Sequence, residues 1–279
     1  MSQLRKKLEM IVSFMQEVFP PYNDCIATRL WIQPNGLLYK QYVIWNLTTF
    51  RNILSLLAVG RSKRIRRIPQ IVTAVKIHYF GPIPLGYLME YCSGQTLWVF
   101  LSDCTVPQTV KRDCFRNLAE VIGRLPKHIF IGDLHGGNVI VSRDGSVRII
   151  DVDGFSFPGN EISCPMAYVP GAEESFQQGK YWHRMGKFRI SRDSDILCFF
   201  GIFLQWLMGG IDPFCYTTWE LLQYIDYLDR AGFPVEIVRM MRRLFEDEPN
   251  FIDPEPFSRI DTDELDRYSY HAFCVSRRE

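Results

Sequence analysis

The sequence has few of the features that mark disulfide-held or zinc-binding proteins. Its 8 cysteines stand singly, without a Cys-x-x-Cys pair or the dense framework that a small secreted fold needs. The histidines outside the central motif have no mutual spacing that suggests a zinc site; they are His78, His128, His183 and His271. We therefore expect reduced, mostly buried thiols.

The sequence also lacks a long apolar run and an excess of charge of either sign. The longest apolar run, residues 196–211, is shorter than the roughly 20 residues that a membrane-crossing helix needs and contains Gln205. It predicts a buried core helix and no membrane span. Glu9 and Glu17 make the N-terminal segment too polar for a secretory signal, which favours a cytoplasmic location. The formal net charge of +1 gives no general attraction to nucleic acid, and no nucleic-acid partner is expected.

The first third of the chain contains both helical and strand-like patterns. Residues 4–19 have apolar side chains at helical spacing and end at Pro20-Pro21, which predicts an amphipathic helix. The Asn35-Gly36 pair lies between two runs rich in branched and aromatic residues, which is a strong hairpin signal. The other elements expected here are a helix over 47–59 and strands over 27–32, 37–44, 71–79 and 84–91.

The pattern becomes mainly helical after Gln95, apart from a strand-turn-strand over 139–152 with Asp144-Gly145 at its turn. A length of 279 residues suits one two-lobed unit or two small domains. We expect an α+β fold with a small antiparallel-sheet N-lobe and a larger helical C-lobe. The expected boundaries are an N-terminal helical extension over 1–20, an N-lobe over 21–89 and a C-lobe over 90–279.

Residues 128–156 carry the candidate chemistry. Asn138 follows Asp133 by five positions, and Asp151 follows Asn138 by thirteen, after an apolar hairpin. This order resembles the catalytic and metal-binding loops of the protein kinase superfamily. The resemblance implies a kinase-like bilobal fold that uses ATP and Mg²⁺. It also implies that Asp133 holds or deprotonates the acceptor hydroxyl, and that Asn138 and Asp151 bind Mg²⁺ through oxygen atoms.

The motif departs from the usual kinase pattern in several places. Ile131-Gly132 stands where the superfamily has His-Arg, and Val152-Asp153 stands where it has Phe-Gly. His135 lies two residues after Asp133, where serine/threonine kinases have a lysine that contacts the γ-phosphate. For His135, a contact with phosphate and a local loop contact are both open interpretations.

Two flanking segments resemble protein kinases as well. Residues 86–97 resemble the strand and hinge, where backbone groups near Glu90 and Cys92 would hydrogen-bond adenine. Residues 195–214 are similar to the buried helix and exit turn of the kinase C-lobe, which aminoglycoside-type phosphotransferases lack in this form. The Asp-Leu-His-Gly-Gly-Asn motif also resembles small-molecule phosphotransferases of the aminoglycoside and choline kinase type, so the acceptor stays open.

The segment 150–174 looks closest to bacterial atypical serine/threonine kinase-like proteins. In those proteins an Ile-Asp-x-Asp-x-Phe stretch is followed by Cys-Pro and then by a Pro-Glu segment, and this chain matches the later part loosely. The resemblance implies that Arg259 pairs structurally with Glu173 or Glu174.

A kinase also needs a strand lysine that holds the α- and β-phosphates, and Lys40 and Lys76 both lie in strand-like surroundings. Lys76 lies only 14 residues before Glu90, too few for the helix and two strands that must intervene. Lys40 lies 50 residues before Glu90. We therefore expect Lys40 to be the ATP lysine.

The usual partner of this lysine is a glutamate on the following helix, but no Asp or Glu lies between Lys40 and the hinge segment. Three outcomes are open: Lys40 pairs directly with Asp151, Glu9 or Glu17 of the N-terminal helix reaches it, or the nucleotide pocket is degenerate. Gly36 is the only glycine before Lys40, so no glycine-rich phosphate loop precedes it.

Three functions fit these observations. They are a Mg-ATP-dependent protein serine/threonine kinase, a small-molecule phosphotransferase, and a pseudokinase that serves as a binding module. We favour the first, with ATP and a protein substrate as partners. The kinase-like C-lobe helix disfavours the second, and the intact Asp133, Asn138 and Asp151 disfavour the third.

Overall fold

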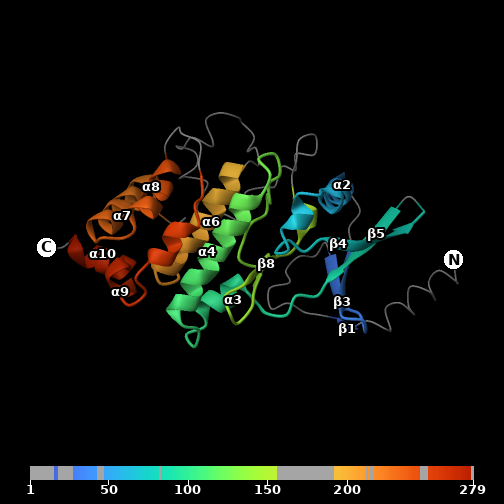
Figure 1. The fold of residues 1–279 in the computed structure, drawn as a ribbon, viewed down its shortest axis with the longest axis horizontal. Helices are drawn as coiled ribbons and strands as arrows, with labels where there is room; N and C mark the ends of the chain where they lie inside the picture. The colour runs from blue at the N-terminus through green and yellow to red at the C-terminus, as the bar shows by residue number, and fades with distance from the viewer. Residues whose placement is uncertain are drawn as a thin grey trace.

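The computed structural model describes residues 16–17, 28–42, 47–81, 83–155, 192–211, 213, 216–245 and 251–277. They form an α+β fold in which a small antiparallel sheet and one long helix lie beside a larger, mainly helical part (Figure 1). The expected fold class, with its small antiparallel sheet, is confirmed at this level. The division into 1–20, 21–89 and 90–279 stays a prediction.

The sheet has five strands in the order β1-β2-β3-β5-β4, and each neighbouring pair is antiparallel. The strands are β1 (Gln16–Glu17), β2 (Thr28–Ile32), β3 (Leu37–Tyr42), β4 (Ala74–Phe80) and β5 (Ile83–Glu90). The turn between β2 and β3 uses Gly36 at a φ of 77°, and Asn35 Oδ1 accepts a hydrogen bond of 3.1 Å from the Leu37 amide. The predicted hairpin is therefore confirmed.

Two expected elements differ from the structure at their ends. Gln16 and Glu17, expected at the end of a helix over 4–19, form β1 instead, where they pair with Ile32 and Trp31; the rest of that range lies outside the described residues. The strand expected over 71–79 begins only at Ala74. The residues just before it bond to the helical part instead, since the Val72 amide donates to the Ile149 carbonyl at 2.9 Å.

Helix α2 (Leu47–Arg61) is the long helix of the sheet-containing part, and it extends the helix expected over 47–59. Ile53, Leu56 and Val59 recur at helical spacing and are buried in the same core cluster as Tyr87 of β5. The helix also contacts the short 3₁₀ helix η2 (Val152–Gly154), which directly follows Asp151. The packing of α2 thus links the sheet to the segment that carries the candidate metal aspartate.

The larger part contains a three-stranded sheet, order β6-β7-β8, and most of the helices. Its helical and strand elements are β6 (Gln95–Thr96), α3 (Leu97–Ser102), α4 (Gln108–Arg124), β7 (Val139–Val141), β8 (Val147–Ile149), α6 (Arg192–Leu207), α7 (Thr218–Arg230), α8 (Val235–Arg243), η4 (Glu255–Arg259), α9 (Leu265–Tyr268) and α10 (Tyr270–Ser276), while η1 (Ile65–Arg67) follows α2. Strands β7 and β8 confirm the hairpin expected over 139–152.

Helix α6 lies at the centre of the helical core, as the apolar run in the sequence predicted. Phe199, Phe200 and Phe203 are completely buried, and their rings contact Phe257 of η4 and each other. Phe115 of α4 packs edge-on against Phe199 and Phe203. Aromatic pairs of this kind contribute about 0.5–1.5 kcal/mol beyond the contribution of their buried area. These contacts therefore stabilise the position of α6 in the helical core.

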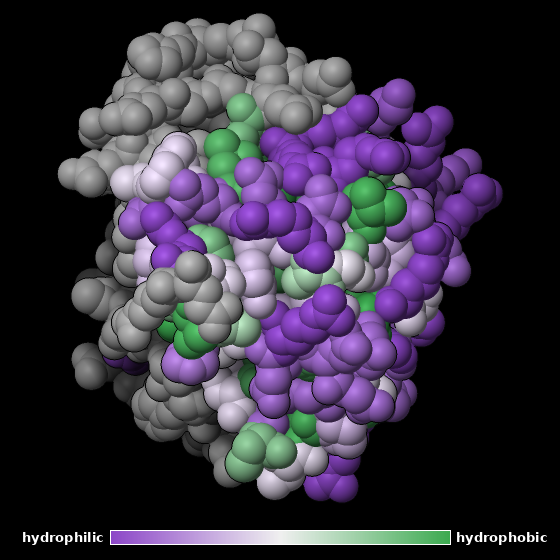
Figure 2. Space-filling model, turned by 90° about the vertical axis from the view of Figure 1, so that its left-hand side faces the viewer, coloured by the Kyte–Doolittle hydropathy of each residue, from purple (hydrophilic) through white to green (hydrophobic). Residues whose placement is uncertain are grey.

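The end of the molecule formed by the C-terminal helices has a mainly hydrophilic face, on which hydrophobic residues occur singly or in small groups (Figure 2). Tyr224, Ile225 and Leu228 of α7 are buried beneath this face, whereas Trp219 of α7, Val235 of α8 and Val275 of α10 are exposed. In the part of the chain that the structure describes, none of the helices combines the length and apolar character that crossing a membrane requires.

Candidate functional site

The loop that carries Asp133 is fixed from below by a buried carboxylate. Asp195, near the start of α6, is only 1% exposed. Its two oxygens accept hydrogen bonds from the backbone amides of Ile131 at 2.8 Å and Gly132 at 2.9 Å. An ionised acceptor makes each bond stronger than a bond between neutral groups. The backbone just before Asp133 is therefore held against the central helix.

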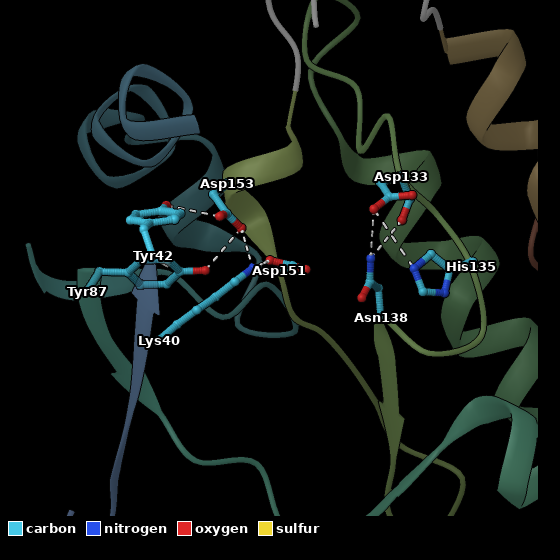
Figure 3. A network of polar contacts seen from close by, with 8 residues as sticks. All are labelled: Lys40, Tyr42, Tyr87, Asp133, His135, Asn138, Asp151 and Asp153. Carbon is cyan, nitrogen blue, oxygen red and sulfur yellow. Dashed lines mark hydrogen bonds and ion pairs between the residues drawn. The ribbon is translucent and has the colours of Figure 1, made fainter. Parts of the chain in front are cut away.

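Asp133 and Asn138 lie side by side across this loop (Figure 3). The Asn138 side-chain amide donates to the Asp133 backbone oxygen at 3.0 Å and to Asp133 Oδ2 at 3.3 Å. The Asn138 backbone amide donates to the His135 carbonyl at 2.9 Å, which closes the turn. Because the nitrogen of the amide faces Asp133, its oxygen Oδ1 points the other way.

His135 contacts its own loop. Its Nδ1 accepts a hydrogen bond of 3.1 Å from the Gly137 amide, so the proton of the neutral ring lies on Nε2, which faces Asp133 Oδ2 at 3.9 Å. Burial lowers the pKa of His135 more than the nearby Asp133 carboxylate raises it, so the neutral ring is favoured. Of the two interpretations of His135, the local loop contact is present, and the contact with phosphate stays a prediction.

Gly136 allows the same loop to lie against Trp98 of α3. A Cβ atom at this position would lie 2.5 Å from Cδ2 of the indole, closer than any carbon contact can be. The backbone approach to the ring thus requires glycine. The first glycine of the Gly-Gly pair in the motif is therefore required by the packing of the Asp133 loop against Trp98.

Asp151 follows β8 and has the left-handed backbone conformation, with φ 63° and ψ 43°. It is the one residue other than glycine with positive φ in the described ranges. This conformation costs about 1–2 kcal/mol, which the surrounding contacts must offset. One of them joins the two loops, since the Ile150 amide donates to the Asn138 carbonyl at 2.9 Å.

Lys40 reaches this region from β3. Its ammonium pairs with Asp151 Oδ1 and lies 3.1 Å from Asp153 Oδ1 (Figure 3). Of the two lysines that the sequence offered, Lys40 is buried in this cluster and Lys76 is exposed on the edge strand β4. The direct pairing of Lys40 with Asp151, one of the three open outcomes, is therefore what the structure contains.

Asp153 is the residue of this site that the sequence reasoning missed. It is 2% exposed, and its carboxylate accepts hydrogen bonds of 3.0 Å from the hydroxyls of Tyr42 on β3 and Tyr87 on β5. The two tyrosine hydroxyls and the Lys40 ammonium all point toward the Asp153 carboxylate (Figure 3). The signal available in the sequence is the second acid of the Ile-Asp-x-Asp-x-Phe stretch, to which the resemblance assigns no role.

Lys40, Asp151 and Asp153 shift one another's pKa values because they lie close together and are largely buried. Burial and the neighbouring Asp151 carboxylate raise the pKa of Asp153 to about 7, against the opposing effect of Lys40. Burial also acts to raise the pKa of Asp151, but the attraction to Lys40 and the hydrogen bonds with Asp153 and Lys40 together outweigh it, and the net pKa is below its usual range. For Lys40, the two carboxylates outweigh burial and raise the pKa, so the ammonium form is strongly favoured.

The two hinge candidates lie at the end of β5, with Glu90 as its last residue and Cys92 two residues further along the chain. The Glu90 side chain is exposed and accepts a hydrogen bond of 2.6 Å from Arg148 of β8. Cys92 lies 4.0 Å from the Glu90 carbonyl through its Sγ, and burial raises the pKa of its thiol. Their backbone role toward adenine stays a prediction. Arg259 pairs with Glu236 at 2.7 Å, and its expected partners near 173 lie outside the described residues.

The donor set suits a hard cation. The Asn138 amide oxygen points away from Asp133, and the second oxygen of Asp151 points away from Lys40 (Figure 3). Amide and carboxylate oxygens are the ligands that Mg²⁺ prefers, usually with waters and phosphate oxygens completing the shell. No cluster of three or more His, Cys, Asp or Glu residues able to hold a metal occurs among the described residues, so an all-protein metal cage is not found there.

Comparison with known proteins gives no family for the chain. No protein-family model matches it, and no curated protein matches it. The functional interpretation therefore rests on the residues of the site and on their geometry.

Proposed function

We propose that this protein transfers the γ-phosphate of Mg-ATP to a serine or threonine hydroxyl of a protein. The observation that carries this proposal is that a backbone hydrogen bond joins the loop of Asp133 and Asn138 to the loop of Asp151, which pairs with a buried lysine from the sheet. One loop carries Asp133 and Asn138, and the other carries Asp151. Lys40 pairs with Asp151 from above.

Each of these side chains has a task in phosphoryl transfer. Asn138 Oδ1 and Asp151 would hold Mg²⁺, and the Lys40 ammonium would hold the nucleotide phosphates. When bound, Mg²⁺ neutralises the negative charge on the phosphate oxygens. Because little covalent chemistry is required of the protein, positioning and charge supply most of the catalysis.

Asp133 would orient the acceptor hydroxyl and accept its proton. Its Oδ2 oxygen is fixed by the amide of Asn138, at 3.3 Å, and faces the neutral ring of His135. The side chain of Asp133 is 31% exposed, which leaves it accessible to an incoming hydroxyl. A general base must reach the proton that it abstracts, and accessibility together with a fixed carboxylate meets that requirement.

The order of elements supports a kinase-like arrangement. The resemblance in the sequence requires a strand lysine followed by a helix and two strands before the hinge. The chain has Lys40 on β3, then α2, β4 and β5, and then Glu90. Under this proposal the backbone near Glu90 and Cys92 binds adenine, and the helical part with α6 at its centre binds the protein substrate.

Two observations favour a second function, that of a pseudokinase binding module. The chain has no glycine before Gly36, and the ammonium of Lys40 is already paired with two carboxylates. A protein of this kind would keep the fold and bind a partner without transferring phosphate. A small-molecule phosphotransferase would instead transfer phosphate to a metabolite.

Phosphoryl transfer tests the proposal directly. With Mg²⁺ and γ-labelled ATP, we expect the purified protein to label itself or a generic protein. Asp133→Asn and Asp151→Asn should abolish the labelling, whereas Asp144→Asn, in the exposed turn between β7 and β8, should leave it unchanged. Labelling that persists in the first two variants would falsify the proposal. In a parallel reaction with a metabolite extract, label found only in metabolites would identify the small-molecule enzyme. Binding of ATP without transfer in either reaction would identify the pseudokinase.

A further inference from the structure

We propose that Asp153 is the positioning residue of Lys40, in the place that a helix glutamate occupies in protein kinases. This inference rests on the proposed function, because its purpose is to keep the Lys40 ammonium ready for nucleotide phosphates. It explains how a chain without any acidic residue on α2 can hold a buried lysine.

The two acidic partners of Lys40 differ in their exposure. The Asp151 side chain is 31% exposed, and the Asp153 side chain is 2% exposed. A ligand can therefore approach Asp151, whereas Asp153 is enclosed by protein. The two carboxylates therefore have different roles in this proposal. Asp151 is available to bind a cation, and Asp153 stays paired with Lys40.

The tyrosines fix the Asp153 carboxylate. Tyr42 lies two residues after Lys40 on β3, so both side chains are on the same face of the sheet, and Tyr87 is the direct neighbour of Lys40 on β5. Tyr87 donates to Asp153 Oδ1 and Tyr42 donates to Oδ2, so each oxygen has a hydroxyl donor. With Lys40 as the third donor, Asp153 is held by protein groups on both oxygens.

Helix α2 supports this arrangement indirectly. Its buried Ser55 donates a hydrogen bond of 2.5 Å to the carbonyl of Phe155, two residues after Asp153. The Phe155 side chain is completely buried in the core. The helix thus anchors the backbone that presents Asp153, whereas in the usual kinase arrangement the helix itself carries the acid.

Asp153 would hold the Lys40 ammonium in place when nucleotide binds. A cation bound to Asp151 would weaken the ion pair between Asp151 and Lys40. Without a second acidic partner, the Lys40 side chain would then lose its position. Asp153 keeps the ammonium on the β3 side of the site, where it faces the phosphates. Replacing the Asp153 carboxyl group by an amide should therefore weaken nucleotide binding through Lys40.

A double-mutant cycle tests this coupling. We expect Asp153→Asn to weaken Mg-ATP binding, measured by calorimetry, by about tenfold to a hundredfold, because one interaction with a charged group is lost. Tyr42→Phe and Tyr87→Phe should each weaken it less. In a Lys40→Met background, Asp153→Asn should change the affinity by less than about twofold, since the residue on which it acts is gone. An equal loss in both backgrounds would overturn the inference.

A second measurement does not depend on nucleotide. An ammonium held in a buried ion pair exchanges its protons slowly, so ¹⁵N-labelled protein should give a resolved NMR signal for the Lys40 side chain, assigned by its absence in Lys40→Met. We expect the signal to broaden or shift in Asp153→Asn. An unchanged signal would overturn the inference whatever the nucleotide affinity. A changed signal in a protein that binds no Mg-ATP would retain the pairing and reject the proposed function alone.

Discussion

Replacing Asp195 by alanine should strongly destabilise the protein, because this carboxylate holds the Asp133 loop on α6. The side chain is 1% exposed and accepts two backbone hydrogen bonds, from Ile131 at 2.8 Å and from Gly132 at 2.9 Å. A hydrogen bond to a charged group contributes about 1.5–3 kcal/mol, so the two together contribute about 3–6 kcal/mol. That is a large share of a total stability of about 5–15 kcal/mol.

Urea unfolding measures this loss. Asp195→Ala should lower the free energy of unfolding by about 3–6 kcal/mol, and Asp195→Asn, which keeps one acceptor oxygen, by about half as much. The second variant keeps the test informative if the first does not fold. Asp226→Asn on α7 is the matched control, because its carboxylate is 58% exposed and pairs only at the surface with Arg242, so a loss below about 1 kcal/mol is expected.

A loss in Asp195→Ala no larger than in Asp226→Asn would refute the idea that α6 fixes the loop. The predicted order of stability is also specific. The wild type should be most stable, then Asp226→Asn, then Asp195→Asn, and Asp195→Ala least stable.

Two further predictions concern the sheet and helix around Lys40. Gly86→Ala on β5 should lower the thermal midpoint markedly, because the new Cβ would lie 2.3 Å from the Lys40 carbonyl oxygen; Gly60→Ala in α2, where no atom lies within 4 Å, should raise it slightly. Similar midpoints for the two variants would contradict the close strand packing. Ser55→Ala should cost about 1–3 kcal/mol in urea unfolding, because the buried Phe155 carbonyl loses a donor. A loss below about 0.5 kcal/mol would show that α2 does not anchor this segment.

The elements that could be predicted from the sequence are those that local signals determine. The Asn35-Gly36 turn fixes a hairpin by backbone conformation, and the apolar run around Phe199 can only be buried. Counting the elements that must follow the ATP lysine favours Lys40 over Lys76. Lys40 lies beside Asp151, and its role toward ATP stays a prediction.

The role of Asp153 could not be predicted, because its contacts are distant in the sequence. Tyr42 lies 111 residues away and Tyr87 lies 66 residues away, and only the pairing of β3 with β5 brings them together. The strand β1 was missed for a similar reason. Apolar spacing around Gln16 suggested a helix, whereas the hydrogen bonds offered by the edge of β2 are visible only in the folded sheet.

Arg259 has a surface partner that the sequence did not indicate. Glu236 of α8 lies 2.7 Å from this arginine, and the expected pairing with Glu173 or Glu174 lies outside the described residues and stays a prediction. Glu236 lies in the first turn of α8, close to η4, because the two elements pack together. Which charged residues pair at the surface depends on how the helices pack, and local sequence patterns do not indicate that packing.

Calorimetric binding of ATP with and without Mg²⁺, in the wild type and in Asp151→Asn, tests the central claim most directly. We predict that the wild type binds ATP in the presence of Mg²⁺. Removing Mg²⁺ with a chelator and removing the Asp151 charge should each weaken binding by about tenfold or more, because both act on the same cation site. The two changes together should weaken it little further. An ATP affinity that is unaffected by either change, or no binding at millimolar ATP, would contradict the assignment of Asn138 and Asp151 to a Mg-ATP site.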